Sequence, residues 1–251
     1  MLPVSDSDLK ARTRPYVNTA LIVVCAAVFI YELAIGDSGR FTFFYQFGVI
    51  PAELAQGVDY TTLITPGGTF DIASPIPNWA TLFTSMFIHA DWLHFGFNML
   101  FLWVFGDNVE DRFGHFRYLL FYLAAGIAAS WLQIAIDTAS QVPTIGASGA
   151  IAGALGAYVV LYPFSRIRTF FLLIIVRVPA IVLLGFWFLF QFLSGVGSLG
   201  PSTQTGGVAY WAHIGGFVLG MIVAAIYKFG APRRPLPREP DVPHYWRGRR
   251  Y

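Results

Sequence analysis

Long apolar segments recur along this chain, and short polar or basic connections separate most of them. We expect six of these segments to cross a membrane, at residues 16–35, 92–105, 118–136, 148–162, 180–193 and 208–227. Only 12% of the 251 residues are charged, against about a quarter in an ordinary soluble domain. Backbone polar groups cannot stay unpaired in lipid, so segments of this kind fold as helices. The sequence therefore predicts an all-α, multi-pass membrane protein.

The positive charges indicate how these segments are oriented. With six spans, every Lys and Arg except Arg40 lies on one side of the membrane, and the positive-inside rule makes that side the cytoplasm. We therefore expect a cytoplasmic N-terminal segment at 1–15, a single domain at 16–228 and a basic, Pro-rich cytoplasmic tail at 229–251. Such a tail is expected to lie against anionic lipid headgroups.

Some connections carry apolar pieces that are too short to cross. Residues 36–91 form a long outer connection, in which 41–50 and 79–88 are expected to lie in the membrane interface. Residues 169–179 are expected to approach the fifth span along the interface. The first apolar segment is longer than the core of a signal peptide, about 7–15 residues, so we expect it to be retained as a span. The single cysteine, Cys25, excludes an internal disulfide and a Cys-rich metal site.

Small residues form stripes along the fourth and sixth segments. On the fourth, glycine or alanine recurs every four residues from Gly149, and on the sixth Gly216 and Gly220 follow His213 at helical spacing. Gly and Ala let membrane helices approach closely. We therefore expect these two helices to pack together and to bring His213 to Ser148, which begins the fourth segment.

Polar side chains near the outer ends of the second, fourth and sixth segments are candidates for function, because polar groups are costly in hydrocarbon. A Ser beside a His can act as a nucleophile with its general base. Asn98, His94 and the backbone N–H of Ser148 are suited to stabilise an oxyanion. No carboxylate lies in the expected spans near these groups, so Ser148 and His213 would form a dyad.

The fourth segment is too short to reach both membrane surfaces. Residues 148–162 would form a helix of about 22 Å, against about 30 Å of hydrocarbon. Ser148 should therefore lie below the outer surface, where a non-helical approach is tolerated only beside a wet cavity. Hydrolysis needs that water.

These residues resemble the motifs of the rhomboid family of intramembrane serine proteases. The family's Gly-x-Ser-Gly motif appears at 146–149, its His-x-x-x-Asn motif at 94–98, and its Ala-His-x-x-Gly-x-x-x-Gly motif at 212–220. The resemblance covers about residues 79–220 and implies a six-helix, rhomboid-like bundle with a long first outer loop. It implies that Ser148 is the nucleophile, that His213 is the general base, and that the side chains of His94 and Asn98 serve the oxyanion hole.

The same resemblance assigns supporting roles. It implies that His89 supports the site by hydrogen bonding and that residues 106–114 form a structural inner loop. Two positions depart from the family pattern, because Trp79 is not followed by Arg and Ala152 stands where an aromatic residue is common. The supporting and inner-loop residues are His89, Gly146, Gly149, Gly216, Gly220, Glu110, Arg112 and Gly114.

Three other functions compete with this interpretation. A metal site built from His89, His94 and His213 would lack an H-E-x-x-H motif and a carboxylate or cysteine at ligand spacing. A transporter would be expected to show paired repeats and charges at mid-depth, which this sequence does not have. A weak or inactive rhomboid-like protein that binds membrane clients is disfavoured because both Ser148 and His213 are present.

We therefore expect an intramembrane serine endopeptidase of a bacterial or archaeal plasma membrane, with its site open to the outside. Its expected partners are single-span membrane proteins and the lipid bilayer, with no nucleic acid, metal or other cofactor. Helical carbonyls are hydrogen-bonded and shielded from attack. We therefore expect cleavage near the outer surface, at small or helix-weakening residues.

Overall fold

The computed structural model describes residues 2–6, 8–9, 11–199 and 208–230, and it is mostly helical. A helix lies at each of the six expected positions, with bounds α1 Tyr16–Ala34, α5 Trp92–Phe113, α6 His115–Ile136, α7 Ser148–Leu161, α8 Ala180–Gly197 and α9 Tyr210–Gly230. The expected loop at 194–207 lies partly, and the basic tail almost wholly, outside the described residues.

Four of these helices, α1, α6, α8 and α9, are long and apolar enough to cross a membrane. This agrees with the expected membrane protein. The helix α5 carries several charged residues toward its end, and α7 has only 14 residues. That these two also cross, which would give six spans, stays a prediction.

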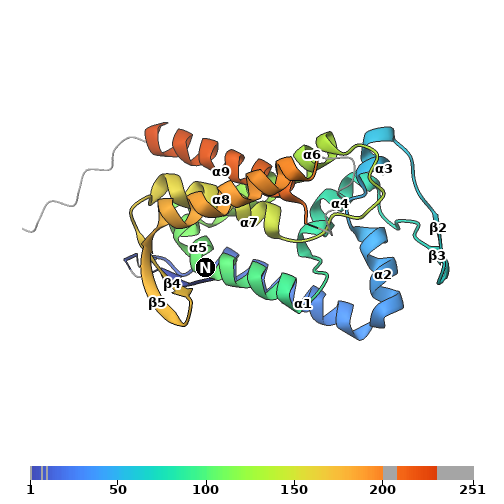
Figure 1. Cartoon of the computed structure of the whole chain (residues 1–251), viewed down its shortest axis with the longest axis horizontal. Coiled ribbons are helices and arrows are strands. Elements are labelled where there is room, and N and C mark those ends of the chain that lie inside the picture. The colour runs from blue at the N-terminus through green and yellow to red at the C-terminus, as the bar shows by residue number, and fades with distance from the viewer. Residues whose placement is uncertain (1, 7, 10, 200–207, 231–251) are drawn as a thin grey trace, which may run out of the picture.

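The long helices run in the same general direction, along the longest axis of the molecule (Figure 1). The helix α7 is the most enclosed of them, and every residue from Gly149 to Tyr158 is buried. Its glycines meet backbone on α9. A Cβ built on Gly216 would lie 2.0 Å from the Gly149 oxygen, and one on Gly220 would lie 1.9 Å from the Gly153 oxygen. Larger side chains would therefore push α7 and α9 apart.

The connection between α1 and α5 gathers at one end of the bundle (Figure 1). It contains α2 Gly36–Phe47, α3 Pro51–Gln56, β2 Thr62–Thr65, β3 Gly68–Asp71, α4 Asn78–Thr84 and the 3-10 helix η1 Ser85–Phe87. Backbone hydrogen bonds fasten this connection to the chain that enters α7. The N–H groups of Val49 and Thr144 donate to each other's carbonyls at 3.0 and 2.7 Å, and the Gly146 N–H donates to the Ser85 oxygen at 2.8 Å.

The prediction of an inner loop at 106–114 was wrong, because α5 continues to Phe113 and α6 begins at His115. The chain turns at Gly114, whose φ of +82° suits glycine. Polar residues in this stretch are buried with partners, which lets the helix continue. The Glu110 carboxylate accepts hydrogen bonds from the Val17 and Asn18 N–H groups at 3.0 and 2.7 Å, and so caps the start of α1.

Two small sheets add to the helices and differ from the all-helical expectation. One is the hairpin β2–β3 of the outer connection. The other has the order β1–β4–β5, with β1 Leu2–Asp6, β4 Arg166–Phe171 and β5 Ile174–Pro179, all antiparallel. Residues 169–179 therefore belong to a hairpin, and the N-terminal segment, which we had set apart from the domain, pairs with it.

Candidate active site

Ser148 is the first residue of α7, and the chain reaches it through a glycine. Gly146 has a φ of +120°, a conformation that L side chains rarely adopt. It also lies against the imidazole of His94, because a Cβ built on Gly146 would be 2.6 Å from His94 Nε2. Both the positive φ and the close contact with His94 require glycine at this position. Because Gly146 has no side chain, the start of α7 can lie directly against His94 of α5.

The structure brings Ser148 and His213 together. The Ser148 hydroxyl lies 2.7 Å from Nε2 of His213, within hydrogen-bonding distance. On the other side of the ring, Nδ1 lies 2.8 Å from Oε1 of Gln191 on α8. When Nδ1–H donates to this amide oxygen, Nε2 carries no proton and can accept one from the serine. The indole of Trp187 lies beside the same imidazole. The two ring centroids are 5.8 Å apart, and the angle between the ring planes is 36°.

His94 and Asn98 lie one turn apart on α5. The Asn98 side-chain amide donates to the His94 carbonyl at 2.8 Å, and an amide nitrogen has a second N–H to offer. Both residues line a cavity of about 450 Å³, which is also lined by Ser148, His213, Gln191 and Trp187. All four residues expected at the site thus border one space.

His89 does not line this cavity but packs behind it. Its buried ring meets the His94 ring edge-on at 5.2 Å. Its backbone N–H donates to the Glu32 carboxylate at 3.2 Å, and its Nδ1 lies 3.2 Å from the Phe87 oxygen. Burial lowers the pKa of His89 to about 4, so the ring is neutral near neutral pH. The geometry suits support of His94 by packing rather than by the expected hydrogen bond, because Nε2 of His89 has no partner among the described residues.

The other supporting residues fall into two groups. Gly149, Gly216 and Gly220 lie in the contact between α7 and α9 described above. Glu110, Arg112 and Gly114 lie at the opposite end of α5 from the cavity. There the Arg112 guanidinium lies over the Tyr227 ring at 5.6 Å, and the Arg112 carbonyl accepts a hydrogen bond from the Tyr227 hydroxyl.

Sequence reasoning missed Gln191, Trp187 and Glu32. Trp187 and Gln191 are four residues apart on α8 and share a face. Gln191 is the one polar side chain in the apolar run 180–193, so the rule that polar groups in hydrocarbon are candidates could have singled it out. Glu32 is wholly buried near the end of α1, and the same rule applies to it.

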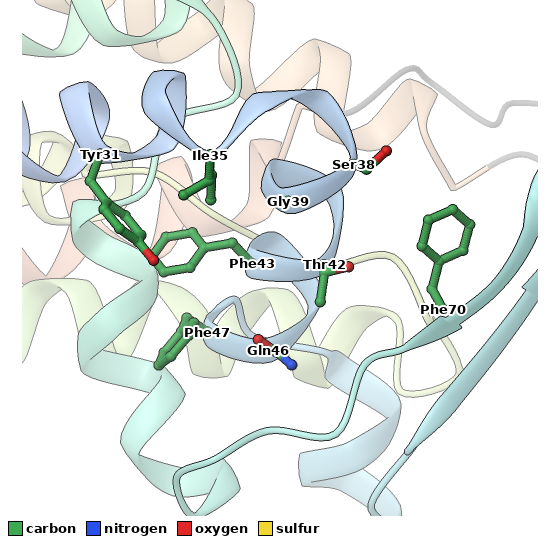
Figure 2. A pocket seen from close by; sticks show the side chains of 9 residues that line it. All are labelled: Tyr31, Ile35, Ser38, Gly39, Thr42, Phe43, Gln46, Phe47 and Phe70. Carbon is green, nitrogen blue, oxygen red and sulfur yellow. The ribbon is translucent and has the colours of Figure 1, made fainter.

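A second hollow lies beside the outer connection. Figure 2 shows its lining residues on the end of α1, on α2 and on β3, with the Tyr31 and Phe43 rings side by side and Phe70 on the strand at the other side of α2. No His, Asp, Glu or Cys lines it, so it does not offer a base for hydrolysis. In the described part of the chain, no three His, Cys, Asp or Glu side chains are placed to hold a metal ion.

Comparison with known proteins places these residues in context. The Rhomboid domain profile matches residues 77–228. The chain is 35% identical over 212 residues to Rhomboid protease GluP of Bacillus subtilis, covering 80% of this chain and 38% of that protein. It is 32% identical over 142 residues to Rhomboid protein 1, mitochondrial, of Saccharomyces cerevisiae, covering 55% of this chain and 39% of that one.

A third relative is Rhomboid-type serine protease 2 of Emericella nidulans, which is 30% identical over 160 residues, or 62% of this chain and 28% of the relative. The chain therefore spans less than two fifths of the length of each of these three relatives. The matched profile covers the helices from α4 to α9 and includes every residue that lines the 450 Å³ cavity.

Proposed function

This chain belongs to the rhomboid family, and from that premise we propose that it is an intramembrane serine endopeptidase. The family is one of intramembrane serine proteases, and the apolar helices make this chain an integral membrane protein. The observation that carries the proposal is the 2.7 Å contact between the Ser148 hydroxyl and His213 Nε2 at the border of a cavity. This pairing is the minimum that nucleophilic hydrolysis needs.

In the proposed mechanism, Ser148 Oγ attacks the scissile carbonyl carbon while His213 Nε2 takes the hydroxyl proton. The tetrahedral intermediate collapses when His213 gives that proton to the leaving amine nitrogen and the C–N bond breaks. A water then attacks the acyl-serine ester, again losing a proton to His213. That proton returns to Ser148 as the ester bond breaks and the new carboxyl terminus leaves.

Gln191 has a positioning role in this mechanism. Its side-chain oxygen accepts the Nδ1–H of His213, which keeps the unprotonated Nε2 directed at the serine. An aspartate usually does this in soluble serine proteases and also stabilises the imidazolium by its charge. An uncharged amide orients the ring without placing a full negative charge among apolar helices, where a charge is costly.

Three donors are available for the oxyanion. The second N–H of the Asn98 amide is not needed for its bond to the His94 carbonyl. His94 lines the same cavity. The Ser148 N–H is at the start of α7, where backbone N–H groups have no intrahelical partner. Donors fixed in place before the reaction are the strongest source of stabilisation for such an intermediate.

We further propose that the substrates are single-span membrane proteins, cut near the outer surface. Two observations support this proposal. The helix α7 has only 14 residues, too few to reach both membrane surfaces, and the glycine-bearing segment before it borders the cavity, through which water would reach the site. The orientation, with cytoplasmic termini in a bacterial or archaeal plasma membrane, rests on the distribution of Lys and Arg. No cofactor is needed for these steps.

The test is labelling of the purified chain with a fluorophosphonate, followed by mapping of the adduct by mass spectrometry. We expect the adduct on Ser148, and no labelling of Ser148→Ala. The matched control is Ser130→Ala, which removes a buried serine of α6 that does not line the cavity. An unlabelled, folded protein that also fails to cut transmembrane substrates would instead favour a client-binding, inactive rhomboid-like protein.

A further inference from the structure

The hairpin β4–β5 connects α7 to α8 along the chain, and backbone hydrogen bonds join the residues at its base to the start of α8. At its base the Ala180 N–H donates to the Ser165 oxygen at 2.8 Å, and the Ile181 N–H donates to the Pro163 oxygen at 2.9 Å. The hairpin runs across the direction of the long helices, at the end of the molecule where the chain begins (Figure 1). Because α8, which follows the hairpin directly, is a candidate membrane span, the hairpin would lie at the level of a membrane surface if α8 crosses.

The tip of this hairpin is a continuous run of exposed apolar residues, from Phe170 to Ile175. Leu172 is 77% exposed and Leu173 is 90% exposed. Near the base the pattern is different, because the buried residues Ile167 and Thr169 alternate with the exposed residues Arg166 and Arg168. A run of this length is unusual on a surface that meets water and indicates a contact with something apolar.

The turn itself is built from residues that do not suit it. Leu172 and Leu173 connect the paired residues Phe171 and Ile174, and have φ values of +46° and +77°. Two-residue hairpin turns with positive φ at both positions normally use Asn-Gly or similar pairs, because side chains such as leucine are strained there. Two leucines at this turn are understandable if the tip must be apolar.

A second observation concerns charge. Arg168 and Arg177 are direct cross-strand partners in the hairpin, and both are exposed. Like charges placed opposite each other destabilise a strand pair. Among the described residues, neither arginine forms a salt bridge with a carboxylate. An anion bound between them would remove the repulsion, and guanidinium groups match phosphate oxygens in a bidentate geometry.

We propose that the β4–β5 hairpin is a lipid-binding element. Its tip residues insert among the acyl chains of the adjacent leaflet, and Arg168 and Arg177 together bind the phosphate of an anionic headgroup. The dimensions agree, because the three residue-to-residue steps from Arg168 to Phe171 span about 10 Å of strand. This is close to the depth of about 5–10 Å to which interfacial elements bury their apolar side. In the proposed orientation this is the cytoplasmic leaflet, and the site is separate from the catalytic cavity.

The test uses the full chain in vesicles of phosphatidylcholine, with acyl chains that are or are not brominated. In a Cys25→Ala background, which removes the only cysteine, a nitrobenzoxadiazole fluorophore is attached at Leu173→Cys. We expect blue-shifted emission and loss of more than half of it in brominated vesicles. The matched control is Gly67→Cys in the turn of β2–β3, which is also exposed but polar, and which we expect to emit as in water without quenching.

The headgroup part of the proposal has its own measurement. Native mass spectrometry counts the phosphatidylglycerol molecules kept by the purified protein, and we expect the Arg168→Gln, Arg177→Gln double variant to lose one. Arg40→Gln, on α2 of the outer connection, should keep the wild-type number. An unchanged number in the double variant would overturn the headgroup site.

Two results would overturn insertion of the tip. One is water-like emission at position 173 in a protein whose melting temperature matches that of the unlabelled chain. The other is a blue shift that brominated lipids do not quench and that disappears as the lipid-to-protein ratio rises. That second result would mean that another copy of the chain covers the tip.

Discussion

The two ends of α7 both carry buried polar groups but use them differently. At the Tyr158 end, the groups satisfy one another. The Tyr158 hydroxyl donates to the Asp6 carboxylate, and the Ser165 hydroxyl donates to the same carboxylate at 3.0 Å. Close by, the Tyr118 hydroxyl donates to the Asn18 side chain at 2.8 Å. These hydrogen bonds hold β1, α1, α6 and α7 in place and leave little capacity for a ligand.

At the Ser148 end, some hydrogen-bond donors and acceptors have no partner among the described residues. The Asn98 amide uses one N–H within α5, and the ring of His89 has an Nε2 with no partner among the described residues. Ser148, His213 and Asn98 also border a cavity, and His89 packs behind it. Satisfied buried polar groups specify structure, whereas incompletely satisfied ones tend to mark function. The comparison predicts that substitutions at one end cost activity and those at the other cost stability.

The largest effect on activity is expected from Ser148→Ala and His213→Ala. Because nucleophile and base act as a unit, each should lower kcat by about 10⁴-fold or more, and the double variant should be no worse than either. The melting temperature should stay close to that of the wild type, since neither change opens a cavity in the core. Cleavage of a transmembrane test substrate and thermal unfolding measure the two quantities. Near-wild-type cleavage by either variant would contradict the dyad.

At the other end of the bundle, Glu110→Ala should act on stability. The carboxylate is fully buried, and its loss leaves the Val17 and Asn18 N–H groups of α1 without their acceptor. Each buried, unsatisfied group costs about 1–3 kcal/mol, so we expect a loss of about 2–5 kcal/mol in unfolding free energy.

The control for Glu110→Ala is Asp111→Ala. Asp111 lies next to Glu110 and also accepts backbone hydrogen bonds, from Arg12 and Thr13, but these are exposed. The Asp111→Ala substitution should lower the free energy of unfolding by about 1 kcal/mol or less. The kcat of the protein that remains folded should not change in either variant. A fall in kcat at unchanged melting temperature for Glu110→Ala would break the contrast between the two ends.

Asn98→Ala should lower kcat by about 10-fold with little change in KM. Removal of one oxyanion donor elsewhere costs about 10²–10³ in kcat, but His94 and the Ser148 N–H can compensate in part here. Steady-state kinetics on the same substrate separate the two constants. If KM alone rose, Asn98 would be a binding or packing residue.

Much of this arrangement could be predicted from the sequence. Apolar runs located the six helices, and the glycine spacing on the segments that became α7 and α9 indicated their close contact. The extension of α5 could not be predicted in the same way, since Glu110 is paired with the start of α1, 92 residues away. The run at 169–179 is apolar except for Thr169, Arg177 and its closing proline, and its periodicity did not distinguish a hairpin from an interfacial segment.

At the site, the spacing of His94 and Asn98 predicted a shared face, but no sequence rule gave the partner of His213. We expected no third member because the spans that carry Asn98, Ser148 and His213 hold no carboxylate. Gln191 fills that place from 22 residues away, and the register between α8 and α9 that allows this is set by packing. The family commonly has an aromatic residue where this chain has Ala152, and in this structure the aromatic ring that lies against His213 is Trp187 of α8.

The smallest effect on kcat is expected from Gln191→Leu. A neutral hydrogen bond contributes about 0.5–1.5 kcal/mol, so loss of the bond to His213 should lower kcat by up to about 10-fold, at 1.36 kcal/mol per factor of ten. KM and melting temperature should change little, because leucine fills a similar volume among apolar neighbours. Gln191→Glu keeps an acceptor at Nδ1 and should retain more activity than Gln191→Leu.

The matched control for Gln191→Leu is Gln133→Leu. The Gln133 side chain also approaches α9 near the site, but it accepts the backbone N–H of Ala212 at 3.3 Å and not the imidazole. The Gln133→Leu substitution should change the melting temperature more than it changes kcat. If the two leucine variants lowered kcat equally, the contribution of Gln191 would be general packing of α9. If only Gln191→Leu did so, and its effect vanished in a His213→Ala background, then the amide acts through the histidine. The open end of α7 would then include a third positioned side chain.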